Sequence, residues 1–265
     1  MTSFPDNLMD AIIEIAEQAS DAILEVYNSS FDIEQKDDNT PVTCADLAAH
    51  NSITDGLARL TPNIPVLSEE STNIPFSERK QWTTYWLVDP LDGTREFIKR
   101  NGEFTINIAL IENNYPTLGV IYTPVTNTCF FAEQNKGAYK QVKGSEAFSI
   151  STRKAPVEKT LTASVRSLND SSLDEFQKNI GKHNTISMGS SLKSCLIAEG
   201  KVDIYPRIGP TSEWDTAAAQ CIIEEAGGCI TTTDMLRLKY NTKESLLNPN
   251  FLAFGDKSIK WNEFL

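Results

Sequence analysis

Four short apolar runs follow one another at the spacing of β-hairpins, and they constrain the fold of this 265-residue chain more than any other feature. The runs cover residues 104–111, 119–125, 129–132 and 138–142. Asparagine, threonine and glycine occupy the connections, as in Asn135-Lys-Gly137, and these residues favour tight turns. Because a hairpin joins strands that run in opposite directions, the pattern predicts an antiparallel meander in the middle of the chain.

Two amphipathic helices are predicted before the meander. Apolar residues recur at spacings of three and four from Leu8 to Tyr27, so the first helix covers this range and ends at Ser29-Ser30. The second begins near Thr43, where Thr43 and Asp46 have the N-cap and N3 positions, and stops at Thr61-Pro-Asn63.

The second half of the chain has a different rhythm. Strand candidates at 160–165, 185–188 and 202–206 alternate with helix candidates at 171–180, 191–199 and 215–226. The whole pattern predicts a mixed α/β protein built of layered helices and sheets. It also predicts a helix–sheet half over residues 1–150 and an α/β half over residues 151–265.

The charge balance excludes one class of partner. Lys and Arg number 24 against 36 Asp and Glu, a net charge of −12. A chain without a broad positive field is not expected to bind a nucleic acid polymer. A small phosphorylated ligand stays possible, because it needs only local cations or a bound metal ion.

The five cysteines and two histidines contain no CxxC pair, which argues against a zinc site. The N-terminus is acidic where a signal peptide needs a basic start, and no apolar run approaches the roughly 20 residues of a membrane span. We expect no integral membrane segment and a reducing, cytoplasmic setting, with peripheral contact at the inner membrane face left open. The sequence indicates no obligate protein partner.

The strongest local signal for chemistry is Asp89-Pro-Leu-Asp-Gly-Thr94, which follows the predicted strand Trp86-Leu-Val88. Pro90 fixes one backbone angle, and Gly93 permits a conformation that other residues resist. A turn of this kind can direct both carboxylates and the Leu91 carbonyl oxygen to one point, and Mg²⁺ prefers oxygen ligands. Taken alone, the motif is more typical of a surface turn than of a metal site.

Further acids favour the metal interpretation. Glu69 and Glu70 end an apolar run before the motif, and Asp215 opens a predicted helix. Asp215 by itself is more typical of a helix N-terminal cap or dipole partner than of a metal ligand. Two rival sites do not fit: an EF-hand needs acids at alternate positions, and the aspartyl-phosphate phosphatases carry their two acids two residues apart, whereas Asp89 and Asp92 are three apart.

Three segments resemble, in order and spacing, the signature motifs of the inositol-monophosphatase superfamily, and the resemblance covers nearly the whole chain. They are Leu67-Ser-Glu-Glu70, Trp86-Leu-Val-Asp-Pro-Leu-Asp-Gly-Thr94 and Trp214-Asp-Thr-Ala-Ala218. Other segments resemble its branch of CysQ-type 3′(2′),5′-bisphosphate nucleotidases: Asn39–Asp46, Glu96–Thr105, Gly189-Ser-Ser-Leu-Lys193 and Tyr205-Pro-Arg-Ile-Gly-Pro210. Arg95 stands where that branch often has lysine, which keeps the charge.

The resemblance implies a layered αβαβα sandwich that binds two Mg²⁺ per chain, with a third as an alternative. Glu69, Asp89 and the Leu91 carbonyl oxygen would hold the first ion, and Asp89, Asp92 and Asp215 the second. Four carboxylates around one point repel one another, so bound metal makes the cluster tolerable. The first half of the chain would supply most of this site and the second half Asp215.

The resemblance also implies the groups that act on the substrate. Asp46 and Thr94, with Glu69 beside them, would take the proton from the attacking water. The Gly189-Ser190-Ser191 segment precedes a predicted helix, whose free N–H groups favour a phosphate, and Lys36 is a further candidate for neutralising the acids. The implied substrate-binding residues are Gly93, Thr94, Gly189, Ser190, Ser191, Lys193, Arg207 and Asp215.

The function implied is Mg²⁺-dependent hydrolysis of the 3′-phosphate of adenosine 3′,5′-bisphosphate (pAp) to AMP, and of the same phosphate in PAPS, with inhibition by lithium. This reaction would recycle pAp in sulfate assimilation. Two alternatives stay open: an inositol- or sugar-phosphate phosphatase with the same metals, and a sensor that binds pAp without cleaving it.

Overall fold

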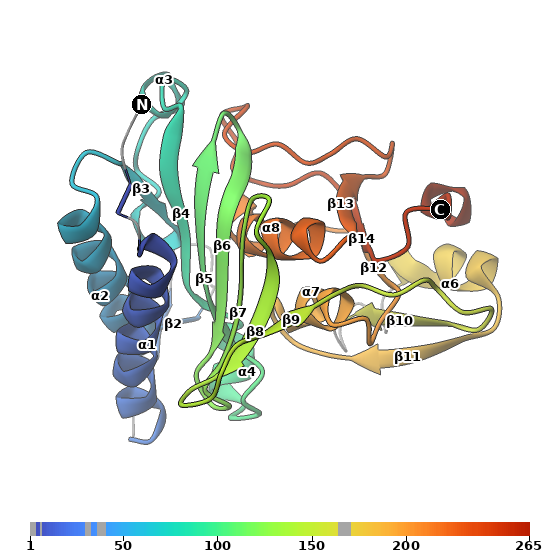
Figure 1. Ribbon diagram of the computed structural model, residues 1–265, viewed down its shortest axis with the longest axis horizontal. Helices are drawn as coiled ribbons and strands as arrows, with labels where there is room; N and C mark the ends of the chain where they lie inside the picture. The colour runs from blue at the N-terminus through green and yellow to red at the C-terminus, as the bar shows by residue number, and fades with distance from the viewer. Residues whose placement is uncertain (1–3, 6, 30–32, 36–40, 164–170) are drawn as a thin grey trace.

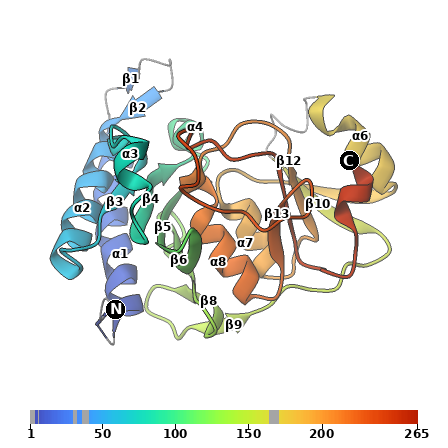
Figure 2. The same cartoon turned by 90° about the horizontal axis from the view of Figure 1, so that it is seen from above.

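The structure, a computed structural model, describes residues 4, 5, 7–29, 33–35, 41–163 and 171–265. The described residues stack in alternating layers of helix and sheet, in the order αβαβα (Figures 1 and 2). Helices α1 (Leu8–Tyr27) and α2 (Cys44–Leu60) form the first layer. The C-terminus lies at the opposite end of the stack, beside α6 (Asp174–Ile180). The predicted layered α/β fold is confirmed.

Within the described ranges, the larger sheet has seven strands in the order β3-β4-β5-β6-β7-β8-β9. The strands are β3 (Val66–Ser68), β4 (Thr84–Asp92), β5 (Thr105–Glu112), β6 (Tyr115–Thr123), β7 (Thr128–Glu133), β8 (Gly137–Val142) and β9 (Phe148–Ile150). All neighbours from β4 onward are antiparallel, so the predicted meander is confirmed, with β9 as an unpredicted last strand. Asn113 and Asn114 both have positive φ in the β5–β6 connection, as a tight hairpin turn requires.

Strand β4 differs from its prediction, because it does not end at Val88. It continues through the acidic motif to Asp92, and its register against β5 shifts between Asp89 and Asp92. Pro90 lies in this interval and has no N–H to donate to the ladder, which accounts for the interruption. The two acids therefore stand on an irregular strand end that precedes the turn at Gly93.

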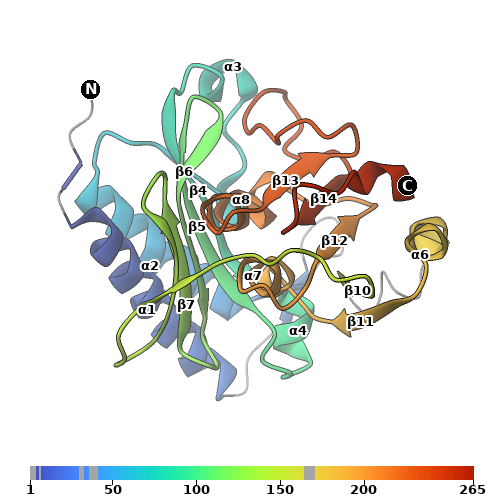
Figure 3. The same ribbon diagram turned by 45° about the vertical axis from the view of Figure 1, so that its right-hand side comes forward.

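The smaller sheet, again within the described ranges, has five strands in the order β11-β10-β12-β14-β13. They are β10 (Lys159–Ala163), β11 (His183–Ser187), β12 (Ile204–Arg207), β13 (Cys229–Thr232) and β14 (Phe251–Phe254). The first three were predicted to within three residues, apart from 164–165, which lie outside the described residues. The last two were not predicted. The chain reaches this sheet through a segment after β9 that crosses the molecule (Figure 3), and the proposed division near residue 150 stays a prediction.

Helices α7 (Leu192–Ala198) and α8 (Ala217–Glu225) lie between the two sheets and share one apolar core with both. Gly119 on β6 allows the close approach of α8, because a Cβ there would lie 2.5 Å from the Ala218 carbonyl oxygen. A second core joins α1 and α2 to the other face of the larger sheet. A third joins the smaller sheet to α6 and to the 3₁₀ helix η4 (Trp261–Phe264).

Several predicted boundaries move slightly. The predicted helix at 171–180 is the 3₁₀ turn η2 (Ser171–Leu173) followed by α6, and the one at 215–226 is η3 (Glu213–Asp215) followed by α8. A ribbon of β1 (Ile33–Gln35) and β2 (Pro41–Thr43) precedes α2 and was not predicted. Lys36 and the start of the Asn39–Asp46 motif lie outside the described residues.

The cysteines and the helices bear on two expectations drawn from composition. Cys44, Cys129, Cys195, Cys221 and Cys229 are all free thiols. Across the described part of the chain, every helix is too short or too polar to cross a membrane.

Candidate active site

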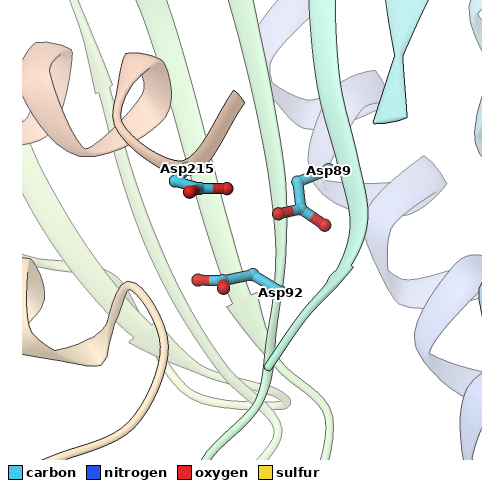
Figure 4. Close-up of side chains that lie close together, drawn as sticks. All are labelled: Asp89, Asp92 and Asp215. Carbon is cyan, nitrogen blue, oxygen red and sulfur yellow. The ribbon is translucent and has the colours of Figure 1, made fainter. Parts of the chain in front are cut away.

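Three aspartates from two distant parts of the chain meet between the larger sheet and η3. Asp89 and Asp92 come from the irregular end of β4, and Asp215 ends η3 (Figure 4). Each offers a carboxylate oxygen, and these oxygens all lie within 4.8 Å of one another. A set of carboxylate oxygens at this separation suits a hard divalent cation.

The electrostatics show how unfavourable this cluster is without a cation. Burial raises the pKa of Asp89 well above its usual range, and the negative charges of Glu69, Asp92, Asp215 and Asp46 raise it further. The pKa of Asp215 rises to about 8, mainly through desolvation and then through Asp92. Positive charge at this point would favour the ionised forms, so the residues present fit a metal site.

The backbone fixes both aspartates of β4. The Leu91 N–H donates to Asp89 Oδ1 at 3.1 Å. Gly93, with φ of +95°, then turns the chain into α4 (Thr94–Ile98). A Cβ at Gly93 would lie 3.2 Å from the Glu103 carbonyl oxygen and 3.3 Å from Ser190 Cβ, so a side chain is excluded both by conformation and by space.

Asp215 has the capping role and also belongs to the acid cluster. The Ser212 N–H donates to Asp215 Oδ2 at 2.9 Å, and the Ser212 side chain completes a capping box around η3. The two interpretations of Asp215 are therefore compatible. The cap fixes one carboxylate oxygen while the side chain faces Asp89 and Asp92 (Figure 4).

A cleft of about 280 Å³ opens beside the cluster. Its lining includes most of the residues predicted to bind substrate, namely Gly93, Gly189, Ser190, Ser191, Lys193, Arg207 and Asp215. Asp92 lines it as well. The cleft thus brings two of the three clustered acids, Asp92 and Asp215, together with cationic side chains that include Lys193 and Arg207.

Asp92 is tied to the loop that precedes α7. Its Oδ2 accepts hydrogen bonds from Ser190 Oγ at 2.7 Å, Ser191 N at 2.7 Å and Ser191 Oγ at 2.9 Å. The Gly189 N–H donates to Glu103 Oε2 at 2.7 Å. The N–H groups of Gly189 and Ser191, expected to receive a phosphate, donate to carboxylates in this structure.

Lys193 and Arg207 differ in their surroundings. Lys193 is buried, and its Nζ donates to the Ser190 carbonyl oxygen at 2.5 Å and the Met188 carbonyl oxygen at 3.4 Å. Burial lowers its pKa, and the charge of Asp92 opposes that shift. Arg207 donates from Nη2 to the Pro210 carbonyl oxygen at 2.8 Å.

The remaining predicted residues lie around the cluster. Glu69 begins the 3₁₀ helix η1 (Glu69–Ser71), directly after β3, which pairs with β4. Asp46 is buried in the first turn of α2. Leu91 is buried on β4, and Thr94 is the first residue of α4. Asp46 and Glu69 both act electrostatically on Asp89, which places their charges near the cluster.

Several residues of the site were not predicted. The cleft lining adds Arg95, Glu96, Lys99, Glu103 and Tyr205. Thr105 and Asn107 on β5 form buried hydrogen bonds with Ser190 and Ser191. A signal for these two exists in the sequence: they are polar residues at alternate positions of an otherwise apolar strand, so both point to the same face.

Comparison with known proteins defines the class to which this fold and site belong. The chain matches the inositol monophosphatase family over residues 5–257, and it is a member of that family. It is 46% identical to the 3′(2′),5′-bisphosphate nucleotidase CysQ of Escherichia coli K12 over 92% of this chain and 98% of that protein. The predicted superfamily and its CysQ-type branch are confirmed.

Solved structures agree with this assignment. The crystal structure of CysQ from Bacteroides thetaiotaomicron is 39% identical, with a TM-score of 0.79 over 93% of this chain and 96% of that one. The extragenic suppressor protein SuhB from Bartonella henselae is 23% identical, with a TM-score of 0.80 over 98% of each chain, and shows the shared fold. Enzymes of this family use divalent metals, with which the cluster of Asp89, Asp92 and Asp215 is compatible.

Proposed function

We propose that the protein is a 3′(2′),5′-bisphosphate nucleotidase that hydrolyses the 3′-phosphate of pAp to give AMP and phosphate. The observation that carries the proposal is that Asp92 and Asp215, two acids of the three-carboxylate cluster, line one cleft together with the cationic side chains of Lys193 and Arg207. The identity of 39–46% with CysQ nucleotidases over nearly the full chain supports the same substrate class.

The metal set proposed is two Mg²⁺ ions. Glu69, Asp89, the Leu91 carbonyl oxygen, Asp92 and Asp215 would hold them. When bound, the ions supply Lewis acidity that polarises the scissile phosphate and lowers the pKa of a coordinated water. The chemistry of the donor set supports this choice, since every donor is a hard oxygen and neighbouring negative charges raise the pKa of both Asp89 and Asp215.

Acidic and hydroxyl side chains of the site are proposed to activate the attacking water. Asp46 and Thr94, with Glu69 beside them, accept the proton of the attacking water. The water oxygen forms a bond to phosphorus, the bond from phosphorus to the ribose 3′-oxygen breaks, and that oxygen takes up one proton to replace the one that the water gave up. The charges of Asp46 and Glu69 act on Asp89, and Asp46 and Asp89 are buried, which supports a role in positioning one water molecule beside the cluster.

Recognition of the nucleotide is assigned to further residues that line the cleft. Arg207 is proposed to bind the phosphate that is not cleaved, because a guanidinium can donate two parallel bonds to it. Lys193 donates to loop carbonyl oxygens, so it is proposed to fix the Gly189–Ser191 loop and to add positive potential. Gly93, which lines the same cleft, and Thr94, which follows it, complete the proposed contacts. Action on PAPS, lithium inhibition, a role in sulfate assimilation and a cytoplasmic setting belong to the same proposal.

The test is phosphate release from pAp, PAPS, AMP and inositol 1-phosphate in parallel, with Mg²⁺, with EDTA, and with Li⁺ added. We expect a strong preference for the two 3′-phosphorylated nucleotides, loss of turnover in EDTA and suppression by lithium. Asp89→Asn, which removes a ligand shared by both ions, should lower turnover on the order of 100-fold or more. It also controls for a contaminating phosphatase.

The other outcomes are equally informative. Preference for inositol 1-phosphate would retain the metal chemistry and reject the nucleotide substrate. Tight pAp binding without turnover would identify a sensor. Arg207→Ala should weaken pAp turnover more than inositol 1-phosphate turnover, and an equal loss on both would remove Arg207 from nucleotide recognition.

A further inference from the structure

We propose that Thr105 and Asn107 of β5 are positioning residues that orient Asp92 for metal binding by fixing the protons of Ser190 and Ser191. The inference rests on the metal site of the proposed function. Neither residue belongs to the acid cluster, and both are almost completely buried.

One carboxylate oxygen of Asp92 has its full set of hydrogen bonds. Its Oδ2 accepts from Ser190 Oγ, Ser191 N and Ser191 Oγ, all at 2.9 Å or less. Three donors use the hydrogen-bonding capacity of that oxygen. Asp92 is therefore oriented to present its other oxygen to a cation, and hydrogen bonds that orient a ligand in this way tune its metal affinity.

The hydroxyl protons of Ser190 and Ser191 are directed by the groups around them. An ionised carboxylate only accepts, so the Ser190 proton points to Asp92 Oδ2, and the Ser191 proton is divided between Asp92 Oδ2 at 2.9 Å and the Asp215 carbonyl oxygen at 3.1 Å. Asn107 Nδ2 donates to Ser191 Oγ at 3.0 Å, which occupies a lone pair of that hydroxyl and leaves its proton for these two acceptors on the metal-site residues. Thr105 Oγ1 lies 2.6 Å from Ser190 Oγ, and because the Ser190 proton is used, Thr105 is the donor there.

Thr105 and Asn107 also support each other. Thr105 Oγ1 lies 3.0 Å from Asn107 Oδ1, so its proton is shared between Asn107 and Ser190. The amide oxygen of Asn107 faces Thr105, and its NH₂ group is thereby directed to Ser191. The pair forms one polar unit under both serines.

The register of the larger sheet brings the polar unit of Thr105 and Asn107 next to the proposed metal ligands. Asp92 pairs with Thr105 across the β4–β5 ladder, and Asp89 pairs with Asn107. Strand β5 lies between β4 and β6 with paired neighbours on both sides. The polar unit thus stands on a rigid central strand, whereas the loop at Gly189–Ser191 that it holds is a connection between elements.

The experiment is calorimetric titration of the substrate-free protein with Mn²⁺ and with Mg²⁺. Thr105→Val keeps the shape of the side chain and removes the hydroxyl, so we expect metal affinity about 10- to 100-fold weaker. Thr105→Ser keeps the hydroxyl and should retain affinity within about threefold of the wild type. The matched control is Thr123→Val on β6, where a buried hydroxyl donates to the Thr128 carbonyl oxygen at 2.6 Å instead of to the site.

A second variant, Asn107→Leu, tests the other half of the unit by the same titration and should also weaken metal binding about 10-fold or more. If Thr105→Val or Asn107→Leu fails to fold, the remaining variant decides. Metal binding equal to that of Thr123→Val in the folded variants would overturn the positioning role. A wild-type protein that binds neither ion would instead reject the proposed metal site, which separates the two failures.

Discussion

Asp215 shows how one residue links stability to function in this protein. Its carboxylate caps η3 through Ser212, and at the same time it faces Asp89 and Asp92 within 4.8 Å. Loss of solvent and the charge of Asp92 raise its pKa to about 8, against an ordinary value of 3.8. The metal-free protein therefore carries an ionisable group in a place that disfavours its charge.

The stability of the metal-free protein should consequently fall as pH rises. Between pH 4 and pH 8 the native Asp215 holds a proton that the unfolded chain has released. The free energy of unfolding then decreases with pH, by up to about 1.4 kcal/mol per pH unit for one group, and levels off above pH 8. Urea unfolding midpoints in EDTA from pH 5 to pH 9 would measure this, and added Mg²⁺ should reduce the decline.

Asp215→Asn provides the control for this prediction. It keeps a side chain of the same size and removes the titration, so its slope in EDTA should be smaller than that of the wild type. A residual slope is expected from Asp89, whose pKa burial raises well above its usual range, and from Glu213, whose pKa burial raises to about 7. An unchanged slope in the variant would show that Asp215 is not the group responsible.

The acidic residues of the site could be predicted from the sequence, whereas the residues that orient them could not. Asp89, Asp92 and Asp215 stand out in the sequence because carboxylates beside proline, glycine and tryptophan form recognisable motifs. Thr105 and Asn107 do not, since their roles depend on a loop more than 80 residues away. Only their alternation within β5 hints that one face of that strand is polar.

The packing of α8 on the larger sheet depends on glycine at position 119, which has no side chain. At Gly119 a Cβ would lie 2.5 Å from the Ala218 carbonyl oxygen and 3.0 Å from Cys221 Cβ. The backbones of β6 and α8 are therefore closer than any other residue would allow. Since η3 leads directly into α8, this contact also sets the distance between Asp215 and β4.

Gly119→Ala should destabilise the protein by about 1–3 kcal/mol, because the added methyl group overpacks a closed interface. Denaturant unfolding would measure the loss. Gly144→Ala is the control: its Cβ would contact nothing within 4 Å, so only the strain of its φ of +82° is added. If Gly119→Ala loses less than about 1 kcal/mol, close packing against α8 is not what Gly119 provides.

Helices and strands could be predicted from the sequence where local periodicity and turn residues determine them. The first two helices and the meander follow from periodicity and turn residues, and the structure contains them at nearly the expected bounds. Strands β13 and β14 escaped prediction because each has four residues and they are separated by a long irregular segment. The pairing of β14 with β12 on one side and with β13 on the other is a long-range contact that short apolar runs do not specify.

Across the whole molecule, polar contacts connect the two halves of the predicted division around the site. Arg79 ends α3 (Phe76–Arg79), in the connection between β3 and β4, and is buried. Its Nη1 donates to Asn241 Oδ1 at 2.6 Å, and its Nη2 donates to the Glu244 carbonyl oxygen. The Asn241 N–H in turn donates to Glu213 Oε2 at 2.8 Å, two residues before Asp215.

This buried network predicts that Arg79→Met destabilises the protein strongly. Removing the guanidinium leaves Asn241 Oδ1 and the Glu244 carbonyl oxygen without this donor, and Glu213 loses a positive charge that lowers its pKa. Breaking a buried charged network of this kind costs about 3–5 kcal/mol. Arg237→Met is the matched control, because Arg237 pairs with Glu224 at 2.6 Å but is 40% exposed, and such pairs contribute about 0–1 kcal/mol. Urea unfolding of both variants would measure the difference. Equal small losses would mean that the layers are held together by their apolar cores alone, and that Asp215 keeps its place without the link to α3.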